Sequence, residues 1–330
     1  MRRKKIVTIG GGTGHYTLLA GLKKYPIEIT AIVSMADDGG STGILRDELG
    51  VLPPGDVRQC LVALSDSSLS LRRLFNYRFD RGGLSGHSFG NLLLSALEKL
   101  TGDFETAIDE ARKILKVRHQ VLPVTRNKAH LVMQLRDGTV LRGEHSIDTT
   151  NIQKKGIRKI YYKPPVTLNP RARKALREAD LILIGPGSHF SSVVPNLLVQ
   201  GMGAAVAASR AKLVYIANVT NKKGHTEGYT AVDYANDIER HLGTSLDMII
   251  ANIGRPTRRE MRPYETQEGK SVMVAPGRPP RHAAYSMVRR NVLSTKKHGV
   301  DRSDRLARQR SFIRHDGEKL GHVIMSMLNA

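Results

Sequence analysis

Short apolar runs alternate with amphipathic segments along this chain. The runs are typical of buried strands, and we expect strands at residues 5–9, 27–33, 179–184, 212–217 and 248–251. Segments between them have helical spacing, as at 16–24, 57–64 and 91–100. Because strands that alternate with helices form parallel sheets covered on both faces, the pattern predicts an α/β fold.

The middle of the chain has a different pattern. Residues 129–135 and 139–145 show near-alternating apolar positions and flank Asp137-Gly138, which is a typical hairpin turn. With a further strand at 160–162, they predict a small β-hairpin insertion within residues 125–165. We assign no chemistry to this insertion.

A glycine-rich loop follows the first expected strand directly. It consists of Gly10, Gly11, Gly12, Thr13 and Gly14. Glycine allows close approach of the backbone, and the free amides of a following helix attract anions, so we expect a phosphate group here. His15 stands where the dinucleotide fingerprint requires its last glycine, and no Walker lysine follows, which argues against NAD binding and a P-loop NTPase. A tight turn without a ligand stays open as an alternative.

The second expected strand leads into a polar turn at residues 36–43, with Asp37, Asp38 and Ser41. If the usual right-handed crossover holds, this turn lies beside the glycine loop at the carboxyl edge of the sheet. The two carboxylates suit a ribose, a Mg²⁺ ion on a diphosphate or a substrate hydroxyl. Turn and helix-cap chemistry is the alternative.

Asp56 is expected to cap the helix at 57–64, with Arg58 in its first turn. A cation is unfavourable at a helix N-terminus, so we expect Arg58 to contact phosphate or to pair with Asp37 or Asp38. A solvent-facing arginine is the alternative.

The segment from Gly86 to Gly90 matches the G-x-S-x-G nucleophile elbow. An elbow needs a buried strand before it, and residues 80–85 are polar and flexible, so we expect Ser88 to be a helix N-cap. His87 and Asn91 lie at the start of the same helix and are expected to face the cleft, although a structural histidine is the alternative.

A second anion-binding loop is predicted after the strand at 179–184. Its candidate residues are Gly185, Pro186, Gly187 and Ser188, joined by Asn196 in the next helix. The strand at 212–217 delivers Asn218, Thr220 and Lys222 to the same edge of the sheet. We therefore expect one polar site at this edge.

The length of 330 residues, 40% of them hydrophobic, suffices for one large α/β domain or two modest ones. There is no uninterrupted apolar run of about 18 residues and no signal-peptide pattern, so we expect a cytoplasmic protein without a membrane span. Cys60 is the sole cysteine, which excludes an intrachain disulfide and a cysteine metal cluster.

The chain is strongly basic, with 52 lysines and arginines against 30 acidic residues and a net charge of +22. The basic residues are more frequent within residues 255–330. Weak RNA binding is expected from such a surface, although a solvated basic face is favoured over a dedicated nucleic-acid site. Aromatic residues make up 5% of the chain, and no RNA-recognition motif accompanies the charge.

Several strings in this chain resemble the gluconeogenesis factor (YvcK-like) family of the CofD, or 2-phospho-L-lactate transferase, superfamily. They are residues 10–14, 18–19, 21–23, 36–41, 53–56 with Arg58, 86–88, 90–93, 185–188, Ser192, 195–198, 228–230 and 314–316. The resemblance covers nearly the whole chain. It implies one Rossmann-like three-layer domain over 1–330, completed by the basic portion at 255–330.

The resemblance also implies a function. Members of this branch bind UDP-sugars and act as regulators more than as established enzymes, with links to carbon use, cell-wall precursor supply and cell shape. By analogy, residues 10–14 and 185–188 would hold the diphosphate, while Asp37, Asp38 and Asn218 would contact ribose, sugar or metal. A homodimer or larger assembly, and a partner enzyme of amino-sugar or cell-wall precursor synthesis, are expected on the same ground.

One string departs from the family pattern. Related sequences usually carry T-Q-P-G-E-T where this chain has residues 221–226, Asn-Lys-Lys-Gly-His-Thr. The extra positive charge suits a diphosphate but leaves the headgroup of the ligand open. Two hypotheses therefore remain, a UDP-sugar-binding regulator without chemistry and a Mg²⁺-dependent transferase acting on a nucleotide diphosphate. An RNA-binding surface at the basic end is the third.

Overall fold

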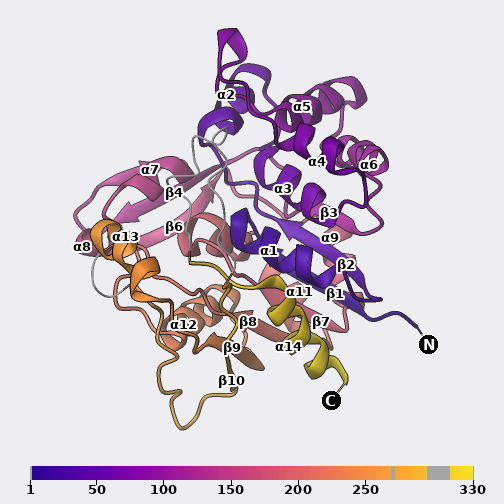
Figure 1. Cartoon of the computed structure of the whole chain (residues 1–330). Coiled ribbons are helices and arrows are strands. Elements are labelled where there is room, and N and C mark those ends of the chain that lie inside the picture. Colours follow the sequence, from indigo (N-terminus) through magenta and orange to yellow (C-terminus); the bar gives the residue numbers. More distant parts are fainter. Residues whose placement is uncertain (1, 269–271, 296–312, 330) are drawn as a thin grey trace.

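A computed structural model describes residues 2–268, 272–295 and 313–329 of the chain. Its main sheet has seven strands in the order β10-β9-β8-β7-β1-β2-β3 (Figure 1). Their bounds are β1 (Lys5–Gly10), β2 (Glu28–Val33), β3 (Gln120–Pro123), β7 (Leu181–Ile184), β8 (Lys212–Ile216), β9 (Met248–Asn252) and β10 (Ser286–Arg290). Neighbouring strands pair in parallel throughout. The predicted α/β fold is therefore confirmed.

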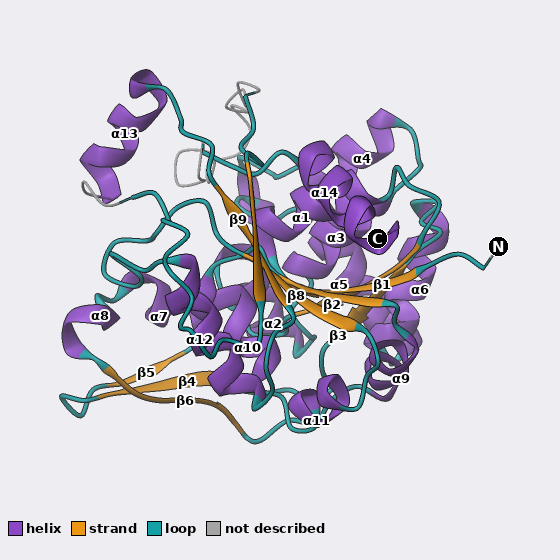
Figure 2. Ribbon diagram, turned by 90° about the horizontal axis from the view of Figure 1, so that it is seen from below, coloured by secondary structure: helices purple, strands orange, loops and turns teal. Residues whose placement is uncertain are grey.

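Helices cover both faces of this sheet (Figure 2). On one face lie α1 (Gly12–Leu22), α3 (Gly55–Leu64) and α14 (Gly317–Asn329). On the other lie α9 (Pro170–Glu178), α10 (Val194–Leu197), α11 (Met202–Ala207) and α12 (Ala231–Leu242). Further helices are α2 (Gly40–Leu49), α4 (Leu69–Asn76), α5 (Phe89–Thr101), α6 (Phe104–Ile114) and α13 (Arg258–Glu268), with a short turn of 3₁₀-helix, η1 (Gly82–Leu84). None of the described helices is long and apolar enough to cross a membrane.

The predicted β insertion is a three-stranded antiparallel sheet in the order β5-β4-β6. Its strands are β4 (His130–Leu135), β5 (Val140–Arg142) and β6 (Ile157–Lys163), with α7 (Glu144–Thr149) and α8 (Ile152–Lys155) between the last two. The insertion lies to one side of the main sheet (Figure 2). Buried side chains of both sheets belong to one contiguous core. The division into a single domain stays a prediction.

Several elements differ from the sequence prediction. Strands β3 and β10 were not predicted, because β3 is short and β10 ends in two arginines, and the strand expected at 139–145 ends at Arg142 and is followed by α7. The largest differences in helix starts are those of α1 and α2. Helix α1 begins at Gly12 and not at Tyr16, and α2 begins at Gly40, inside the turn expected at 36–43. Glycine has a low intrinsic helix propensity, which hides both starts in the sequence. Tertiary contacts compensate, since the amide of Gly12 donates to Asp56 Oδ1 at 2.9 Å.

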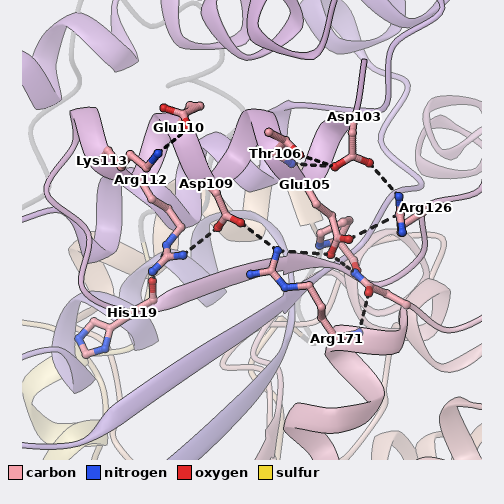
Figure 3. Close-up of polar contacts among 12 residues, drawn as sticks. Asp103, Glu105, Thr106, Asp109, Glu110, Arg112, Lys113, His119, Arg126 and Arg171 are labelled. Atoms are coloured by element: carbon pink, nitrogen blue, oxygen red, sulfur yellow. Dashed lines mark hydrogen bonds and ion pairs between the residues drawn. The ribbon is translucent and has the colours of Figure 1, made fainter. Parts of the chain in front are cut away.

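A network of ion pairs joins α6 to α9 and to the loop after β3 (Figure 3). Arg171 Nη1 contacts Asp109 Oδ2 at 3.0 Å, and Arg126 Nη2 contacts Asp103 Oδ1 at 3.0 Å. The amide of Asn169 donates to Glu105 Oε1 at 2.7 Å in the buried part of this network. Exposed pairs of this kind contribute roughly 0–1 kcal/mol each, so the network supplies orientation more than stability.

Candidate functional site

The loops after β1 and β7 lie side by side, because these two strands are neighbours in the sheet. β2 pairs with the other side of β1, so the order of strands reverses here, and open α/β sheets bind ligands at the carboxyl end of such a switch point. A cavity of about 420 Å³ lies there. Its lining comprises Gly11–Gly14, Thr17, Glu144, Asp148, Pro186–Ser192, Asn218–Lys222, His225, Thr226, Tyr234, Tyr264, Glu268, Ile313, Arg314 and His315.

The first glycine loop forms the N-terminal end of α1. Gly12 has a φ of +68°, a backbone conformation that favours glycine. A Cβ on Gly14 would lie 2.7 Å from the carbonyl oxygen of Pro186, so only glycine lets the two loops approach this closely. The N-cap residue, Gly11, has no side chain to cap α1, and no acidic residue lies in its first turn, although the Asp56 carboxyl group accepts the amide of Gly12. This end of the helix therefore suits an anion.

The second loop runs from Gly185 to Ser188 and is held by Asn218. The side-chain amide of Asn218 donates to the carbonyl of Gly187 at 2.9 Å, and its oxygen accepts the Gly187 amide at 3.3 Å. A short π-helix, η2 (His189–Val193), follows the loop. Such π-helical turns are frequent at functional sites. Asn218 thus positions this loop by two hydrogen bonds in addition to lining the cavity.

Thr220 and Lys222 follow β8 and reach the cavity as predicted. Thr220 forms an isolated antiparallel bridge with Met273. The ammonium of Lys222 pairs with the carboxylate of Asp148 and also donates to its backbone carbonyl at 2.8 Å. Burial, followed by the positive charge of Lys222, lowers the pKa of His225 in the same loop to about 4, so this imidazole is neutral at physiological pH.

Helix α7 of the insertion contributes two carboxyl groups, Glu144 and Asp148, to the cavity. The sequence pattern of the insertion indicated no chemistry, and this wall of the site was missed. Residues four apart lie on one face of a helix, but the pattern predicted a strand at 139–145, which includes Glu144, and that prediction is wrong from residue 144 on. What the sequence did not reveal is that this face would meet the loops of the main sheet.

Three carboxyl groups at the edge of the cavity hold their protons more firmly than usual. Burial, reinforced by the charge of Asp37, raises the pKa of Asp56 to about 7. Burial, reinforced by Asp37 and Asp148, raises the pKa of Glu144 to about 8. Burial also raises the pKa of Asp37. At neutral pH this region therefore carries fewer negative charges than its carboxyl groups suggest, which favours an anionic ligand nearby.

Half of the predicted site residues lie elsewhere than in the cavity lining. They are Gly10, Asp37, Asp38, Ser41, Asp56, Arg58, His87, Asn91, Gly185 and Asn196. Gly185 directly precedes the residues of its loop that line the cavity. Whether any of them contacts a ligand stays a prediction.

Arg58 is buried, so the solvent-facing alternative is wrong. Its Nε donates to Asn91 Oδ1 at 2.9 Å, and another of its nitrogens donates to Asn76. Asn91 in turn donates to Ser41 Oγ at 3.3 Å, and His87 Nδ1 lies 3.2 Å from the same oxygen. These side chains form a buried polar network that joins α2, α3 and α5.

The carboxylates of the acidic residues after β2 accept hydrogen bonds from backbone amides. Asp37 Oδ1 accepts the amide of Gly39 at 3.0 Å, and Asp38 Oδ1 accepts the amide of His145 at 2.8 Å. Asp38 thereby contacts the start of α7 in the insertion. Asp56 does not cap the helix at 57–64 as expected, because that helix begins at Gly55 and the Asp56 carboxylate accepts the amide of Gly12 instead.

Asn196 is fully buried, and its amide donates to the carbonyls of Ser192 at 2.7 Å and Gly10 at 3.4 Å. It therefore joins the start of the first glycine loop to η2. The predicted N-cap role of Ser88 is confirmed, since its Oγ accepts the amide of Asn91 at 3.2 Å.

In the part of the chain that the structure describes, no three His, Cys, Asp or Glu side chains are grouped so that they could hold a metal ion. The Mg²⁺ site expected at Asp37 and Asp38 stays a prediction. Much of the expected basic stretch, with Arg302, Arg305, Arg308 and Arg310, lies outside the described residues.

Comparison with known proteins gives consistent matches over most of the chain. Residues 6–293 match the family described as 2-phospho-L-lactate transferase CofD. A gluconeogenesis factor from Halalkalibacterium halodurans is 46% identical over 277 residues, which are 83% of this chain and 85% of that protein. The gluconeogenesis factor of Bacillus subtilis is 43% identical over 82% of this chain and 86% of its own length.

The fold gives the same result. A crystal structure of a UPF0052 family member from Bacillus halodurans superimposes with a TM-score of 0.87 at 38% identity, over 98% of this chain and 99% of that one. The glycine loops and the insertion that frame the cavity lie within residues 6–293, the part of the chain that matches the family model. The chain therefore belongs to the gluconeogenesis factor family of the CofD superfamily.

Proposed function

We propose that this chain is a cytoplasmic regulatory protein that binds a nucleotide-diphosphate-linked sugar, of the UDP-sugar class, in the cavity between the loops after β1 and β7. In the same proposal, occupancy of the cavity reports on carbon metabolism and cell-wall precursor supply, with consequences for cell shape. Its expected partner is an enzyme of amino-sugar or cell-wall precursor synthesis, and its expected state is a homodimer or larger.

The observation that carries this proposal is the pairing of the two loops across one cavity. The first turn of α1, which contains no acidic residue, faces it, and Lys222 and Arg314 add cationic groups to its lining. Backbone amides, a helix dipole and cations are the groups that proteins use for a diphosphate. A volume of about 420 Å³ is within the usual range for a small-molecule site.

The test is calorimetric titration of the protein with UDP-N-acetylglucosamine, UDP-glucose and GDP, each with and without Mg²⁺. We expect metal-independent binding of the UDP-sugars. Lys222→Ala should weaken it about tenfold, as expected for loss of one hydrogen bond to a charged group. Lys223→Ala is the matched control, because Lys223 is exposed and is not among the cavity-lining residues. Absence of UDP-sugar binding would overturn the proposal.

A transferase is the second candidate, because the matching family bears the name of 2-phospho-L-lactate transferase. It predicts Mg²⁺-dependent preference for the guanine nucleotide and turnover that Asp37→Asn abolishes while nucleotide affinity is largely retained. Metal-independent UDP-sugar binding without turnover would favour the regulator over this candidate.

A further inference from the structure

Asp148 lies where three separate segments meet at the cavity. It belongs to α7 of the insertion, its Oδ1 accepts the hydroxyl of Ser191 in η2 at 3.0 Å, and its carboxylate pairs with Lys222 after β8. Burial raises the pKa of this carboxyl group, but the hydrogen bond and charge of Lys222, together with the hydrogen bond from Ser191, outweigh burial and lower the pKa. Asp148 is therefore an anion built into the site, held by the lysine that the cavity offers to a ligand.

The same loop fastens the insertion to the main sheet. Gln153 and Glu227 exchange two hydrogen bonds, from the Gln153 side-chain amide to the Glu227 carbonyl at 2.8 Å and from the Glu227 amide to Gln153 Oε1 at 2.9 Å. The backbone amide of Gln153 donates to the Gly224 carbonyl at 2.8 Å. Residues 144–155 and 221–227 thus form one connected wall of the cavity.

A diphosphate in this cavity would offer Lys222 a second acceptor with the same chemistry as the Asp148 carboxylate. The diphosphate would also place negative charge beside Asp148 and Glu144. This charge repels the Asp148 carboxylate once Asp148 has lost its contact with Lys222. When Lys222 moves to the ligand, the ion pair between α7 and the loop after β8 is therefore lost. The ammonium has three N–H donors and already contacts both the carboxylate and the carbonyl of Asp148, so a diphosphate that draws Lys222 to itself competes with both contacts.

We propose that Asp148 is a positioning residue that holds Lys222 in the unliganded protein and releases it to an anionic ligand, so that ligand binding loosens α7 and the insertion. The inference rests on the proposed function, since it assigns to that site the step by which occupancy reaches the surface. The insertion is then the part of the molecule that differs between the unliganded and the liganded protein.

A double-mutant cycle tests this step, with inorganic pyrophosphate as the probe so that the result does not depend on the base or the sugar. Asp148→Asn should raise the affinity for pyrophosphate about tenfold, a typical size for coupling between sites. In the Lys222→Ala background the gain should be clearly smaller, because no lysine remains to be released. An equal or larger gain in affinity without Lys222 would overturn the proposal, because Asp148 would then act only by repelling pyrophosphate.

Hydrogen exchange supplies a readout that a merely structural role would not move. In the wild-type protein, saturating pyrophosphate should increase deuterium uptake across residues 144–155; in Asp148→Asn the uptake should already be raised and should not respond. Unchanged uptake in the wild type at saturation would overturn the coupling.

Asp137→Asn is the matched control. Asp137 forms an ion pair with Lys155 at 3.1 Å in the same insertion and lies outside the cavity lining, so its loss should leave both readouts unchanged. If the UDP-sugars fail to bind while the pyrophosphate cycle behaves as expected, the proposed function fails and the role of Asp148 stands. If the UDP-sugars bind and the cycle shows no coupling, only the role of Asp148 fails.

Discussion

Glu144 is the residue whose charge state matters most for an anionic ligand. It lines the cavity, and its pKa of about 8 means that it is largely protonated at neutral pH. Above that value it adds a negative charge beside the ligand. His225 and His315, with pKa values lowered to about 4 by burial, stay neutral throughout this range and do not contribute.

We therefore expect the affinity for a UDP-sugar to fall about tenfold between pH 7.5 and 9, which corresponds to ~1.4 kcal/mol of repulsion between charges a few ångströms apart. The window lies above the pKa of about 7 for Asp56, so that Asp56 changes little within it. Glu144→Gln should bind equally well across the window. Calorimetry at the two pH values checks this, and an equal fall in the variant would show that another group titrates.

The free energy of unfolding should depend on pH in the opposite sense from the dependence that a salt-bridged carboxylate produces. The native state retains the protons of Asp56 and Glu144 up to pH values of about 7 and 8, while the unfolded chain loses them near pH 4. Between these limits the native state binds more protons, so the free energy of unfolding should fall as the pH rises from about 4 to 8. Urea unfolding should show less of this fall in Glu144→Gln than in the wild type.

At the scale of elements, the contact between α1 and α14 sets the position of the glycine loop. A Cβ on Gly21 would lie 1.9 Å from the carbonyl oxygen of Gly317, so the two helices touch through their backbones. The C-terminal helix therefore braces the helix whose N-terminal end faces the cavity.

Gly21→Ala should lower the free energy of unfolding by about 2 kcal/mol, because the added methyl meets a backbone that cannot move independently. The higher helix propensity of alanine opposes this loss, so a gain in stability would contradict the observed packing. Gly83→Ala is the control, since a Cβ there meets no atom within 4 Å. Urea unfolding of both variants gives the comparison.

At the scale of the whole molecule, the net charge of +22 produces an attraction to polyanions that needs no dedicated site. Exposed arginines in the described part of the C-terminal portion include Arg258, Arg259, Arg289 and Arg290. We expect weak binding of single-stranded RNA at low salt, without base preference, that is lost at about 200 mM salt. Fluorescence anisotropy across a salt series checks this, and salt-resistant or sequence-selective binding would instead support a dedicated RNA site.

Local sequence patterns determined most strands of the main sheet and the order of the two glycine loops along it. The apolar runs at 27–33 and 179–184 correspond closely to β2 and β7, and the glycines after β1 and β7 marked the two loops of the cavity. These features depend on neighbours in the chain, because a buried strand and a tight turn each impose their own local composition.

Tertiary structure alone decided which polar groups share the cavity. Glu144 and Asp148 reach it because the insertion folds back onto loops from the other half of the chain, whereas Arg58 and Asn91 point into a network behind it. Asp56 receives an amide 44 positions away in the sequence instead of capping its own helix. Such contacts depend on how whole elements pack, and the local pattern around each residue carries no information about the partner that packing will bring to it.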